Sequence, residues 1–304
     1  MNEDRPASSE RAQVRTFHHS AYTAGQIAAA RAQRQLSVAV CLPARECAGT
    51  VGEIVTALSA LREADALDRI VVIDAASPDG TAGLAAQAGA EVLQQDDLLP
   101  SFGPVLGKGD AMWRATSALD SDVVCFIDAD SERFSAHFAT GLLGALLCEP
   151  DVSFVKAFYR RPLTGDTPGG EEGGRVNHLM ARPALALFYP QLAGVRQPLA
   201  GEVAARRDLL ERLPFATGYG VEIAMLIDAW RAVGLAGIAQ VDLDEHHNRH
   251  QPLSALSPMA LTVLASIAVR LEQEGRLAGK GVTANAPAER PPLQSLAGLS
   301  QSGV

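Results

Sequence analysis

The run from Val123 to Asp130 places the strongest constraint on this chain, because five apolar residues end abruptly in an Asp-Ala-Asp sequence. An apolar run of this length predicts a buried strand, so Asp128 and Asp130 stand at its carboxyl end. Two neighbouring carboxylates repel each other unless a cation shares their site. Hard divalent ions such as Mg²⁺ and Mn²⁺ bind carboxylate oxygens and bridge to the phosphates of a substrate. The alternative is a solvated turn in which the two aspartates only cap the following segment.

Two strand–loop–helix units precede this run. Apolar stretches at 36–42 and 69–73 predict buried strands, and each leads through a polar loop into a segment whose apolar residues have helical spacing. Tandem units of this kind predict an α/β fold with a mostly parallel sheet flanked by helices. Ligands of such sheets bind beyond the carboxyl ends of the strands, which is where both polar loops would lie.

The rest of the chain divides into ordered and polar stretches. Further strands are expected at 152–159 and 237–243, whereas the stretch from 197 onward is expected to lead into a helix. An amphipathic helix near the C-terminus would cover the sheet or pair with a second subunit, and we predict a homodimer. The predicted division is an N-terminal extension at 1–35 whose first 20 residues are disordered, one large domain at 36–245, a loop and helix at 246–276, and a disordered tail at 277–304.

The composition narrows the class of protein. The formal net charge of −9 argues against nucleic acid as a partner, because binding to a phosphate backbone requires concentrated Lys and Arg. The four cysteines show no Cys-x-x-Cys spacing, which favours reduced thiols in a cytoplasmic protein. The N-terminus has no apolar signal-peptide region, and no uninterrupted apolar stretch is long enough to span a bilayer. We therefore expect neither secretion nor membrane insertion.

Two cations that follow glycines are candidates for binding anions. Lys108 stands between Gly107 and Gly109 at an expected helix start, where free backbone N–H groups and the ammonium group suit a pyrophosphate. Arg175 follows a glycine-rich stretch at 164–174, which is expected to form a mobile loop, and it could hold a second anion. The alternatives are an exposed lysine on a turn and a surface arginine on a helix.

Acidic and imidazole side chains later in the chain complete the set of candidates. Glu222 stands among apolar residues at an expected helix start, so it should face a polar partner or a ligand, or else stabilise the helix dipole. His246, His247 and His250 fall within five positions after the last expected strand. They could supply a metal ligand or a phosphate contact, and the alternative is a solvated polar turn.

Several motifs occur in the order found in one known family. With Asp128-Ala129-Asp130 behind tandem strand–helix units, the chain resembles GT-A glycosyltransferases, in which an Asp-x-Asp pair holds the metal on a nucleotide-sugar pyrophosphate. More narrowly, it resembles the actinobacterial glucosyl-3-phosphoglycerate synthases and their mannosyl-transferring relatives. The motifs that carry this resemblance are Leu42-Pro43-Ala44, Gly107-Lys108-Gly109, Phe158-Tyr159-Arg160-Arg161-Pro162-Leu163, Gly173-Gly174-Arg175-Val176, Gln197-Pro198-Leu199-Ala200-Gly201-Glu202 and Gly218-Tyr219-Gly220-Val221-Glu222-Ile223.

The resemblance implies a GT-A type, Rossmann-like, mostly parallel sheet flanked by helices, with a C-terminal helical extension. It also implies a retaining enzyme that uses Mg²⁺ or Mn²⁺ to move a hexose, with glucose preferred, from a nucleoside diphosphate to the 2-hydroxyl of 3-phosphoglycerate. Carried over residue by residue, it implies donor contacts from Pro43, Ala44, Arg45, Ser77, Lys108, Asp128, Ala129 and Glu222, acceptor contacts from Gly174, Arg175, Val176 and Asn177, catalytic roles for Asp130, Lys108 and Glu222, and a metal ion on Asp130.

Two departures from the family pattern leave parts of this prediction open. Arg45-Glu46-Cys47 stands where the family has Asn-Glu-Glu, so the choice between uridine and guanosine and between glucose and mannose stays undecided. The metal-binding histidine of the family aligns with Asn248, so His250 or His247 would have to replace it. The main alternative is a mannosyl-3-phosphoglycerate synthase that uses GDP-mannose. A sugar-phosphate nucleotidyltransferase and a non-catalytic sugar-nucleotide binder are more distant alternatives.

Overall fold

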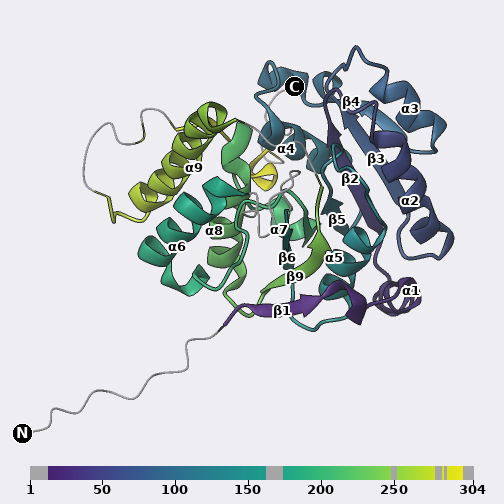
Figure 1. The fold of residues 1–304 in the computed structure, drawn as a ribbon, viewed down its shortest axis with the longest axis horizontal. Coiled ribbons are helices and arrows are strands. Elements are labelled where there is room, and N and C mark those ends of the chain that lie inside the picture. Colours follow the sequence, from purple (N-terminus) through teal and green to yellow (C-terminus); the bar gives the residue numbers. More distant parts are fainter. Residues whose placement is uncertain (1–12, 162–173, 248–251, 278–282, 284–285, 297–304) are drawn as a thin grey trace, which may run out of the picture.

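The computed structural model describes residues 13–161, 174–247, 252–277, 283 and 286–296. Within these residues eight strands form one sheet in the order β1-β9-β6-β7-β5-β2-β3-β4 (Figure 1). Neighbouring strands are parallel except that β7 runs antiparallel to both β5 and β6, which agrees with the predicted mostly parallel sheet. The strands are β1 Arg15–His18, β2 Val38–Ala44, β3 Arg69–Asp74, β4 Glu91–Gln94, β5 Val123–Phe126, β6 Phe154–Arg160, β7 Val203–Arg206 and β9 Ile238–Glu245.

Helices cover both faces of this sheet because alternate side chains of each central strand point to opposite faces. Along β2, Val38, Val40 and Leu42 lie in the core that α2 and α5 complete, whereas Ala39 and Cys41 lie in the core that α4 and α8 complete. The helices are α1 Ala24–Arg34, α2 Val51–Glu63, α3 Thr81–Gln87, α4 Lys108–Ala118, α5 His137–Leu147, α6 Arg182–Phe188, α7 Arg207–Leu210, α8 Val221–Val233 and α9 Leu253–Gln273.

The carboxyl ends of three adjacent strands form one rim of the sheet. Strand β2 lies between β3 and β5, with Ala44 opposite Asp74 on one side and Cys41 opposite Phe126 on the other. The loops that follow these strands therefore begin side by side. The Asp-Ala-Asp sequence directly after β5 lies at this rim, as the apolar run before it predicts.

The N-terminal segment and the stretch after residue 197 differ from their predictions. The lead up to residue 20 was expected to be disordered, yet Arg15–His18 forms strand β1, which pairs in parallel with β9 at the sheet edge. The stretch from 197 onward was expected to lead into a helix, yet residues 203–206 form strand β7 between β5 and β6. An alanine-rich segment favours a helix by propensity, but a place between two strands overrides that preference. Only the short helix α7 follows.

The C-terminal segment corrects the prediction of a disordered tail. Residues 286–296 pack on the body of the protein, and β10, Glu289–Arg290, pairs antiparallel with β8, Phe215–Ala216. Arg290 forms an ion pair of 2.5 Å with Asp110, whose side chain is fully buried, and the indole N–H of Trp113 donates to the carbonyl of Pro291. The prediction failed because hydrogen bonds and ion pairs hold this segment, and a search for apolar periodicity does not detect them.

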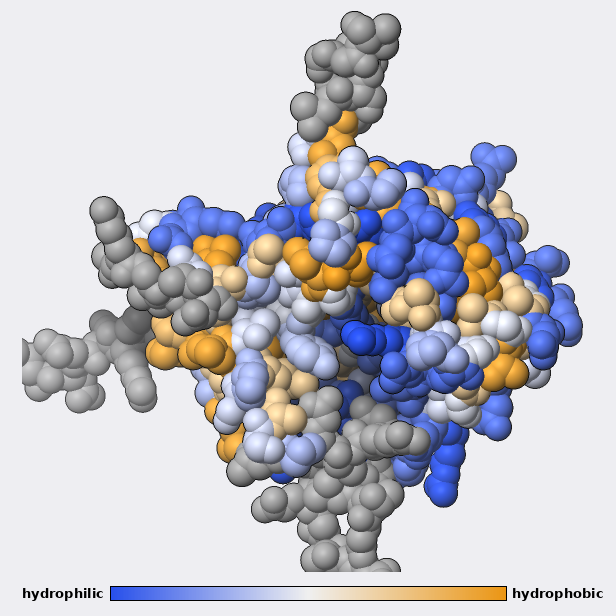
Figure 2. Space-filling model, turned by 90° about the horizontal axis from the view of Figure 1, so that it is seen from above, coloured by the Kyte–Doolittle hydropathy of each residue, from blue (hydrophilic) through white to orange (hydrophobic). Residues whose placement is uncertain are grey.

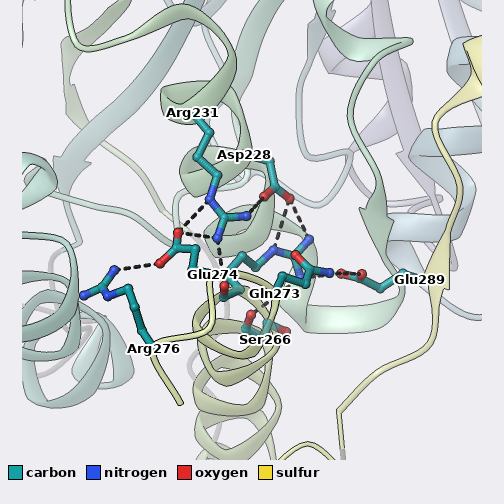
Figure 3. A network of polar contacts seen from close by, with 8 residues as sticks. Asp228, Arg231, Ser266, Gln273, Glu274, Arg276 and Glu289 are labelled. Atoms are coloured by element: carbon teal, nitrogen blue, oxygen red, sulfur yellow. Dashed lines mark hydrogen bonds and ion pairs between the residues drawn. The ribbon is translucent and has the colours of Figure 1, made fainter. Parts of the chain in front are cut away.

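Ion pairs join α8, α9 and the C-terminal segment (Figure 3). Buried Arg270 of α9 contacts Asp228 of α8 at 2.6 Å and also forms an ion pair with Glu289 of β10. Residues 254–273 of α9 are long and on average apolar enough to cross a membrane, although polar residues interrupt the apolar run, and 39% of that window is buried. The buried Arg270 network, with Ile267 and Leu271 in the core, is the packing of a helix that covers a globular protein.

Candidate active site

Lys108 lies at the centre of the site because two glycines shape the start of α4. Gly107 has φ of +89°, in the region that favours glycine, and a Cβ atom on Gly109 would lie 1.9 Å from the carbonyl oxygen of Ala216. The turn therefore brings α4 against the segment before α8. As a result the ammonium group of Lys108 contacts Asp128 directly and lies 3.1 Å from Glu222 Oε1.

The charge of Lys108 is fixed by its two neighbours. Burial alone would lower the pKa of the ammonium group, but the carboxylates of Asp128 and Glu222 hold that pKa well above its usual value. Lys108 therefore stays protonated at neutral pH. Three residues that the sequence placed at donor or catalytic positions, Lys108, Asp128 and Glu222, thus meet in one charged cluster.

This cluster lines a cavity of about 210 Å³. The view in Figure 2 shows a hollow near the centre of one face, bordered by hydrophilic residues. The same cavity is also lined by the segment that was predicted to hold the acceptor, Gly174, Arg175, Val176 and Asn177. The predicted mobile loop at 164–174 lies outside the described residues except for Gly174. Predicted donor and acceptor residues therefore face the same cavity.

Asn177 fixes the predicted acceptor segment to a neighbouring loop. Its side-chain amide donates to the carbonyl of Arg196 at 3.2 Å, and its carbonyl oxygen accepts from the N–H of Leu199 at 3.4 Å. Asn177 is buried, and it begins a single π-helical turn, Asn177–Ala181, before α6. Its observed contacts hold the segment in place, so the contact to a ligand that the resemblance implied stays a prediction.

Arg161, Gln197 and Tyr219 also line the cavity and were not selected from the sequence. The Arg161 guanidinium donates to the Tyr159 hydroxyl at 2.9 Å, while its buried Nε atom has no hydrogen-bond partner among the described residues. The sequence signal for Arg161 was its position, because it follows the end of an expected strand and lies within a motif of the family that the chain resembles. Two guanidinium groups, those of Arg161 and Arg175, therefore line a cavity in which only Arg175 was predicted.

The two aspartates of the Asp-Ala-Asp sequence have different surroundings. Asp128 lies against Gly201, where a Cβ atom would come within 2.1 Å of a carboxylate oxygen, so the glycine makes room for it. Asp130 is exposed and lies outside the cavity lining. Desolvation and repulsion from Asp128 raise the pKa of Asp130 above its usual value. The repulsion from Asp128 is the part of this shift that a bound cation would relieve.

A buried network that the sequence did not reveal supports the Asp-Ala-Asp loop. The Tyr159 hydroxyl donates to Glu202 at 2.8 Å, and His246 Nε2 lies 3.3 Å from Glu202 and 2.8 Å from the Ser131 hydroxyl. Burial alone would raise the pKa of Glu202, but His246 and Tyr159 hold it well below its usual range. Strand β7 delivers Glu202, and because that strand was missed, its partners could not be found.

The predicted histidine ligand of the metal is only partly described. The Glu132 N–H donates to the His247 carbonyl at 2.8 Å, which brings the backbone at 247 close to the Asp-Ala-Asp loop. The His247 ring lies 3.5 Å from Glu245, and His250 lies outside the described residues. Among the described residues, no group of three metal-ligating side chains converges on Asp130. The carboxylates of the rim are nevertheless ligands of the type that Mg²⁺ and Mn²⁺ prefer.

The other predicted donor residues lie on the rim beside the cavity. Pro43 and Ala44 end β2, and Arg45 begins the loop after it. The Ser77 hydroxyl accepts from the N–H of Glu46 at 2.9 Å, so the loops after β2 and β3 are joined. The Thr50 hydroxyl donates to the Ala129 carbonyl at 2.6 Å, which joins the first loop to the Asp-Ala-Asp sequence. These residues are therefore brought together at the rim, and their nucleotide contacts stay predictions.

The C-terminal segment stabilises the turn that precedes Lys108. Asp110 accepts from the Leu106 N–H at 2.9 Å, and this hydrogen bond spans the turn that precedes Lys108. Hydrogen bonds from Arg290 and Leu106, together with the charge of Arg114, hold the pKa of Asp110 below its usual value despite burial. The same segment also approaches Gly220, where a Cβ atom would lie 3.1 Å from Pro287. Residues 286–291 thus brace both the Lys108 turn and the segment that leads to Glu222.

Comparison with known proteins gives a consistent result. Residues 39–172 match the family described as Glycosyl transferase family 2. The chain is 42% identical to glucosyl-3-phosphoglycerate synthase of Petrotoga mobilis over 86% of this chain and 82% of that protein. It is 41% identical to the Mycobacterium tuberculosis enzyme of the same name over 84% of this chain and 79% of that protein.

Solved structures agree with the sequence matches. Mannosyl-3-phosphoglycerate synthase from Rubrobacter xylanophilus superimposes with a TM-score of 0.85 at 42% identity, covering 93% of this chain and 97% of that one. Glucosyl-3-phosphoglycerate synthase from M. tuberculosis in complex with Mn²⁺, uridine-diphosphate-glucose and phosphoglyceric acid gives 0.81 at 37% identity, covering 93% and 99%. The predicted GT-A fold is confirmed.

Proposed function

This chain belongs to the glucosyl-3-phosphoglycerate synthase family, and on that premise we propose that it transfers glucose from UDP-glucose to the 2-hydroxyl of 3-phosphoglycerate. The observation that carries this proposal is the arrangement of charge in the cavity. Lys108 with its two carboxylates lines the cavity together with Arg161 and Arg175. A cavity that holds a protonated lysine for a diphosphate and two guanidinium groups for a phosphorylated acid suits a two-substrate transfer.

Different residues of this chain would have different roles in the transfer. Lys108 is protonated and lies where it can neutralise charge that develops on a leaving diphosphate. Glu222 lines the same cavity and can accept hydrogen bonds from sugar hydroxyl groups. Arg161 and Arg175 present planar forks of donors that match carboxylate and phosphate groups. Binding by these groups would hold the acceptor hydroxyl near the anomeric carbon, and such positioning lowers the barrier by itself.

The carboxylates of the cavity favour a transfer with retention of configuration. Among the described residues that line the cavity, Asp128 and Glu222 are the only acids, and both are paired with Lys108. Neither is free to attack the anomeric carbon from the opposite face. We therefore favour attack by the acceptor hydroxyl on the face from which the diphosphate leaves, with its proton passing to the departing phosphate.

Mg²⁺ or Mn²⁺ fits the rim beside this cavity. Asp130 is exposed, and desolvation together with repulsion from Asp128 raises the pKa of its carboxyl. Asp130 would hold the ion, with His247 or His250 as the candidate protein ligand from the loop after β9. The ion, when bound, supplies positive charge to the leaving diphosphate. Solved relatives are complexed with Mn²⁺ or Mg²⁺ and a uridine nucleotide.

The alternative donor is a mannosyl nucleotide. The similarity to the Rubrobacter mannosyl-3-phosphoglycerate synthase, at 42% identity over most of both chains, favours it. The curated relatives described above carry the glucosyl name, which supports glucose. Both donors would use the same acceptor cavity, so the choice depends on the rim around Arg45 and Ser77.

One assay tests the proposal. Purified protein is incubated with 3-phosphoglycerate, Mn²⁺ and UDP-glucose, GDP-glucose, UDP-mannose or GDP-mannose in turn, and the nucleotide products and the configuration of the new bond are measured. We expect release of UDP and formation of an α-linked glucosyl product. A preference for GDP-mannose would establish the mannosyl alternative. Release of pyrophosphate would establish a nucleotidyltransferase, and donor binding without turnover would establish a binder.

Replacement of Asp130 by alanine tests the metal site. We expect Asp130→Ala to abolish Mn²⁺-dependent turnover while leaving the melting temperature unchanged, because the side chain is exposed and has no role in the core. Asp120→Ala is a matched control, since Asp120 is an exposed aspartate that pairs with Arg69 away from the cavity. Normal turnover by Asp130→Ala at any Mn²⁺ concentration would contradict the role of Asp130.

We also propose that the protein works in the cytoplasm. Its four cysteines are free thiols, and Cys41, Cys47 and Cys125 are buried. Free thiols are the usual state in reducing compartments. The activity in cell fractions would test this point: recovery with the membrane fraction would contradict it.

A further inference from the structure

Two histidines and an aspartate converge at the sheet edge opposite the strands that form the substrate rim. His18 ends β1 and His19 follows it, while Asp244 belongs to β9, which pairs with β1. His18 Nε2 lies 3.2 Å from Asp244 Oδ1, and His19 Nε2 lies 2.7 Å from Asp244 Oδ2. The ligand atoms of all three side chains lie within 4.8 Å of one another.

We propose that His18, His19 and Asp244 bind a divalent transition-metal ion of the Zn²⁺ type, at a site separate from the substrate cavity. Two imidazole nitrogens and one carboxylate are a usual set of protein ligands for zinc, and a fourth position remains for water. Ligand bonds of about 2.0–2.2 Å in a tetrahedral site place neighbouring ligand atoms about 3.4 Å apart. The observed separations need only small side-chain rotations to reach that value.

Neighbouring groups hold the three side chains in this arrangement. The His137 ring packs on the His19 ring with centroids 4.3 Å apart, and its own Nε2 is engaged with the Leu243 carbonyl at 3.0 Å. Asp244 has φ of +63°, and its N–H donates to the Asp242 carboxylate at 3.0 Å. A non-glycine residue in the left-handed region is unusual and often marks a functional position. The set is therefore partly organised before an ion arrives.

The second ring nitrogen of His18, Nδ1, faces two groups of Ser20. His18 Nδ1 lies 2.7 Å from the Ser20 hydroxyl, which can accept its proton when Nε2 faces an ion. The Ser20 N–H also faces Nδ1 at 3.2 Å, an arrangement that suits the tautomer with the proton on Nε2. Binding of an ion at Nε2 would require the tautomer with the proton on Nδ1.

The ion would join the N-terminal edge strand to the last strand of the sheet. Strand β1 has four residues and pairs only with β9 among the described strands. A shared ion would raise the free energy needed to detach β1, because it binds the folded edge and not the separated strands. A set with two imidazole nitrogens differs from the carboxylate-rich rim at Asp130, so the two sites should prefer different ions. The role is structural and does not depend on the proposed transfer reaction.

Titration of the full-length protein with Zn²⁺ tests the site, using calorimetry for binding and thermal unfolding for stability. The Asp130→Ala variant provides the background, because it removes the rim ligand that could also take Zn²⁺. In that background we expect one Zn²⁺ per chain with micromolar affinity and a higher melting temperature. Adding His19→Ala or Asp244→Asn should weaken binding by about ten- to a hundredfold and abolish the rise in melting temperature.

Controls keep the result specific. His178→Ala removes another accessible histidine outside the cluster and should leave Zn²⁺ binding unchanged. Asp244→Asn is close to isosteric, so it tests the ligand even if a histidine variant fails to fold. A Co²⁺ absorption spectrum typical of four-coordinate nitrogen and oxygen ligands, lost in Asp244→Asn, would support the site. Binding that occurs only at millimolar Zn²⁺, or that His19→Ala and Asp244→Asn leave unchanged, would overturn the proposal.

Discussion

At the scale of single residues, the position of Lys108 depends on the two glycines beside it. Lys108 could be selected because the glycines beside it signal an unusual backbone, and the structure gives each glycine a reason: a positive φ at Gly107 and a close contact at Gly109. Arg161 carried no such signal, and Glu202 directly precedes strand β7, which was missed. Side chains that act through local backbone geometry can therefore be found from the sequence, whereas those that depend on a distant partner cannot.

Arg175 gives the first prediction at this scale. We expect Arg175→Ala to raise the KM for 3-phosphoglycerate by about ten- to a hundredfold, the loss that follows removal of a charge-assisted hydrogen bond. The KM for the nucleotide sugar should change little. Arg182→Ala is the matched control, because Arg182 lies on α6 beyond the cavity lining. An equal rise in both KM values would mean that Arg175 shapes the whole cavity and is not an acceptor ligand.

Lys156 gives a second prediction, which concerns stability. This lysine is fully buried in β6, where its ammonium group donates to the Ala200 carbonyl, and burial lowers its pKa from 10.5 to about 8. Between these values the unfolded chain binds the proton and the folded protein does not, so stability rises as pH increases through that window. Below pH 8 the folded protein bears the full cost of the buried charge, which is about 3 kcal/mol from the size of the shift.

Denaturant unfolding of the wild type and Lys156→Met from pH 7 to pH 10.5 measures this effect. We expect the wild type to gain about 2–3 kcal/mol relative to the variant as pH rises, because only the wild type has the buried titrating group. The comparison cancels the titration of other groups. A constant difference between the two proteins over this range would show that Lys156 keeps an ordinary pKa.

At the scale of elements, pattern predicted the βα units but not the segments held by polar contacts. Strands β2, β3 and β5 are apolar runs that span both cores, and their positions follow from composition. Strand β10 is only Glu289–Arg290, and it is held by antiparallel pairing with β8 and by two buried or half-buried ion pairs. A charged residue can be recognised as structural only when its ion-pair partner is known. The partner of Arg290, Asp110, lies 180 residues earlier in the sequence.

The pair between Arg290 and Asp110 can be tested directly. Arg290→Met leaves buried Asp110 with Arg114 as its remaining cationic partner, so we expect a loss of about 2–3 kcal/mol in unfolding free energy. Turnover should also fall, because Asp110 holds the turn before Lys108. The double variant Arg290→Met with Asp110→Asn should recover much of the stability, since no buried charge then lacks its partner.

A surface pair provides the control for this experiment. Arg276 is exposed and pairs with Glu274, so Arg276→Met should cost less than about 1 kcal/mol. Equal destabilisation by Arg290→Met and Arg276→Met would show that the C-terminal segment is only loosely attached. Stability and turnover are measured on the same samples, which separates loss of fold from loss of support for Lys108.

At the scale of the whole molecule, the fold could be predicted from the tandem strand–helix units, but the exposed apolar surfaces could not. The outer faces of α6, α9 and the π-helical turn before α6 expose large leucines, with Leu179 at 79%, Leu187 at 72% and Leu261 at 54% exposure. Helices α6 and α9 lie on the same side of the molecule in Figure 1, and apolar residues appear at the corresponding edge of Figure 2. Exposed apolar surface of this kind is typical of an interface.

The predicted homodimer can be tested on this surface. We expect the wild type to elute as a dimer in size-exclusion chromatography with light scattering, and Leu187→Asp or Leu261→Asp to shift it toward the monomer. Placing a carboxylate in an apolar interface without a partner is strongly unfavourable. Leu84→Asp is the matched control, because Leu84 is an exposed leucine on α3, which lies on the opposite side of the molecule from α6 and α9 (Figure 1). A monomeric wild type would refute the dimer.

The brace formed by residues 286–291 has a consequence for how this protein is made. The partners of Arg290 and Pro291 lie 180 and 178 residues earlier in the chain, so these contacts cannot form until residues 290 and 291 have left the ribosome. The strand–helix units that contain β2, β3 and β5 can collapse much earlier during synthesis. A nascent chain would thus contain the motifs of its family before residues 286–291 stabilise the turn at Lys108. It would acquire full activity only after this late step of folding.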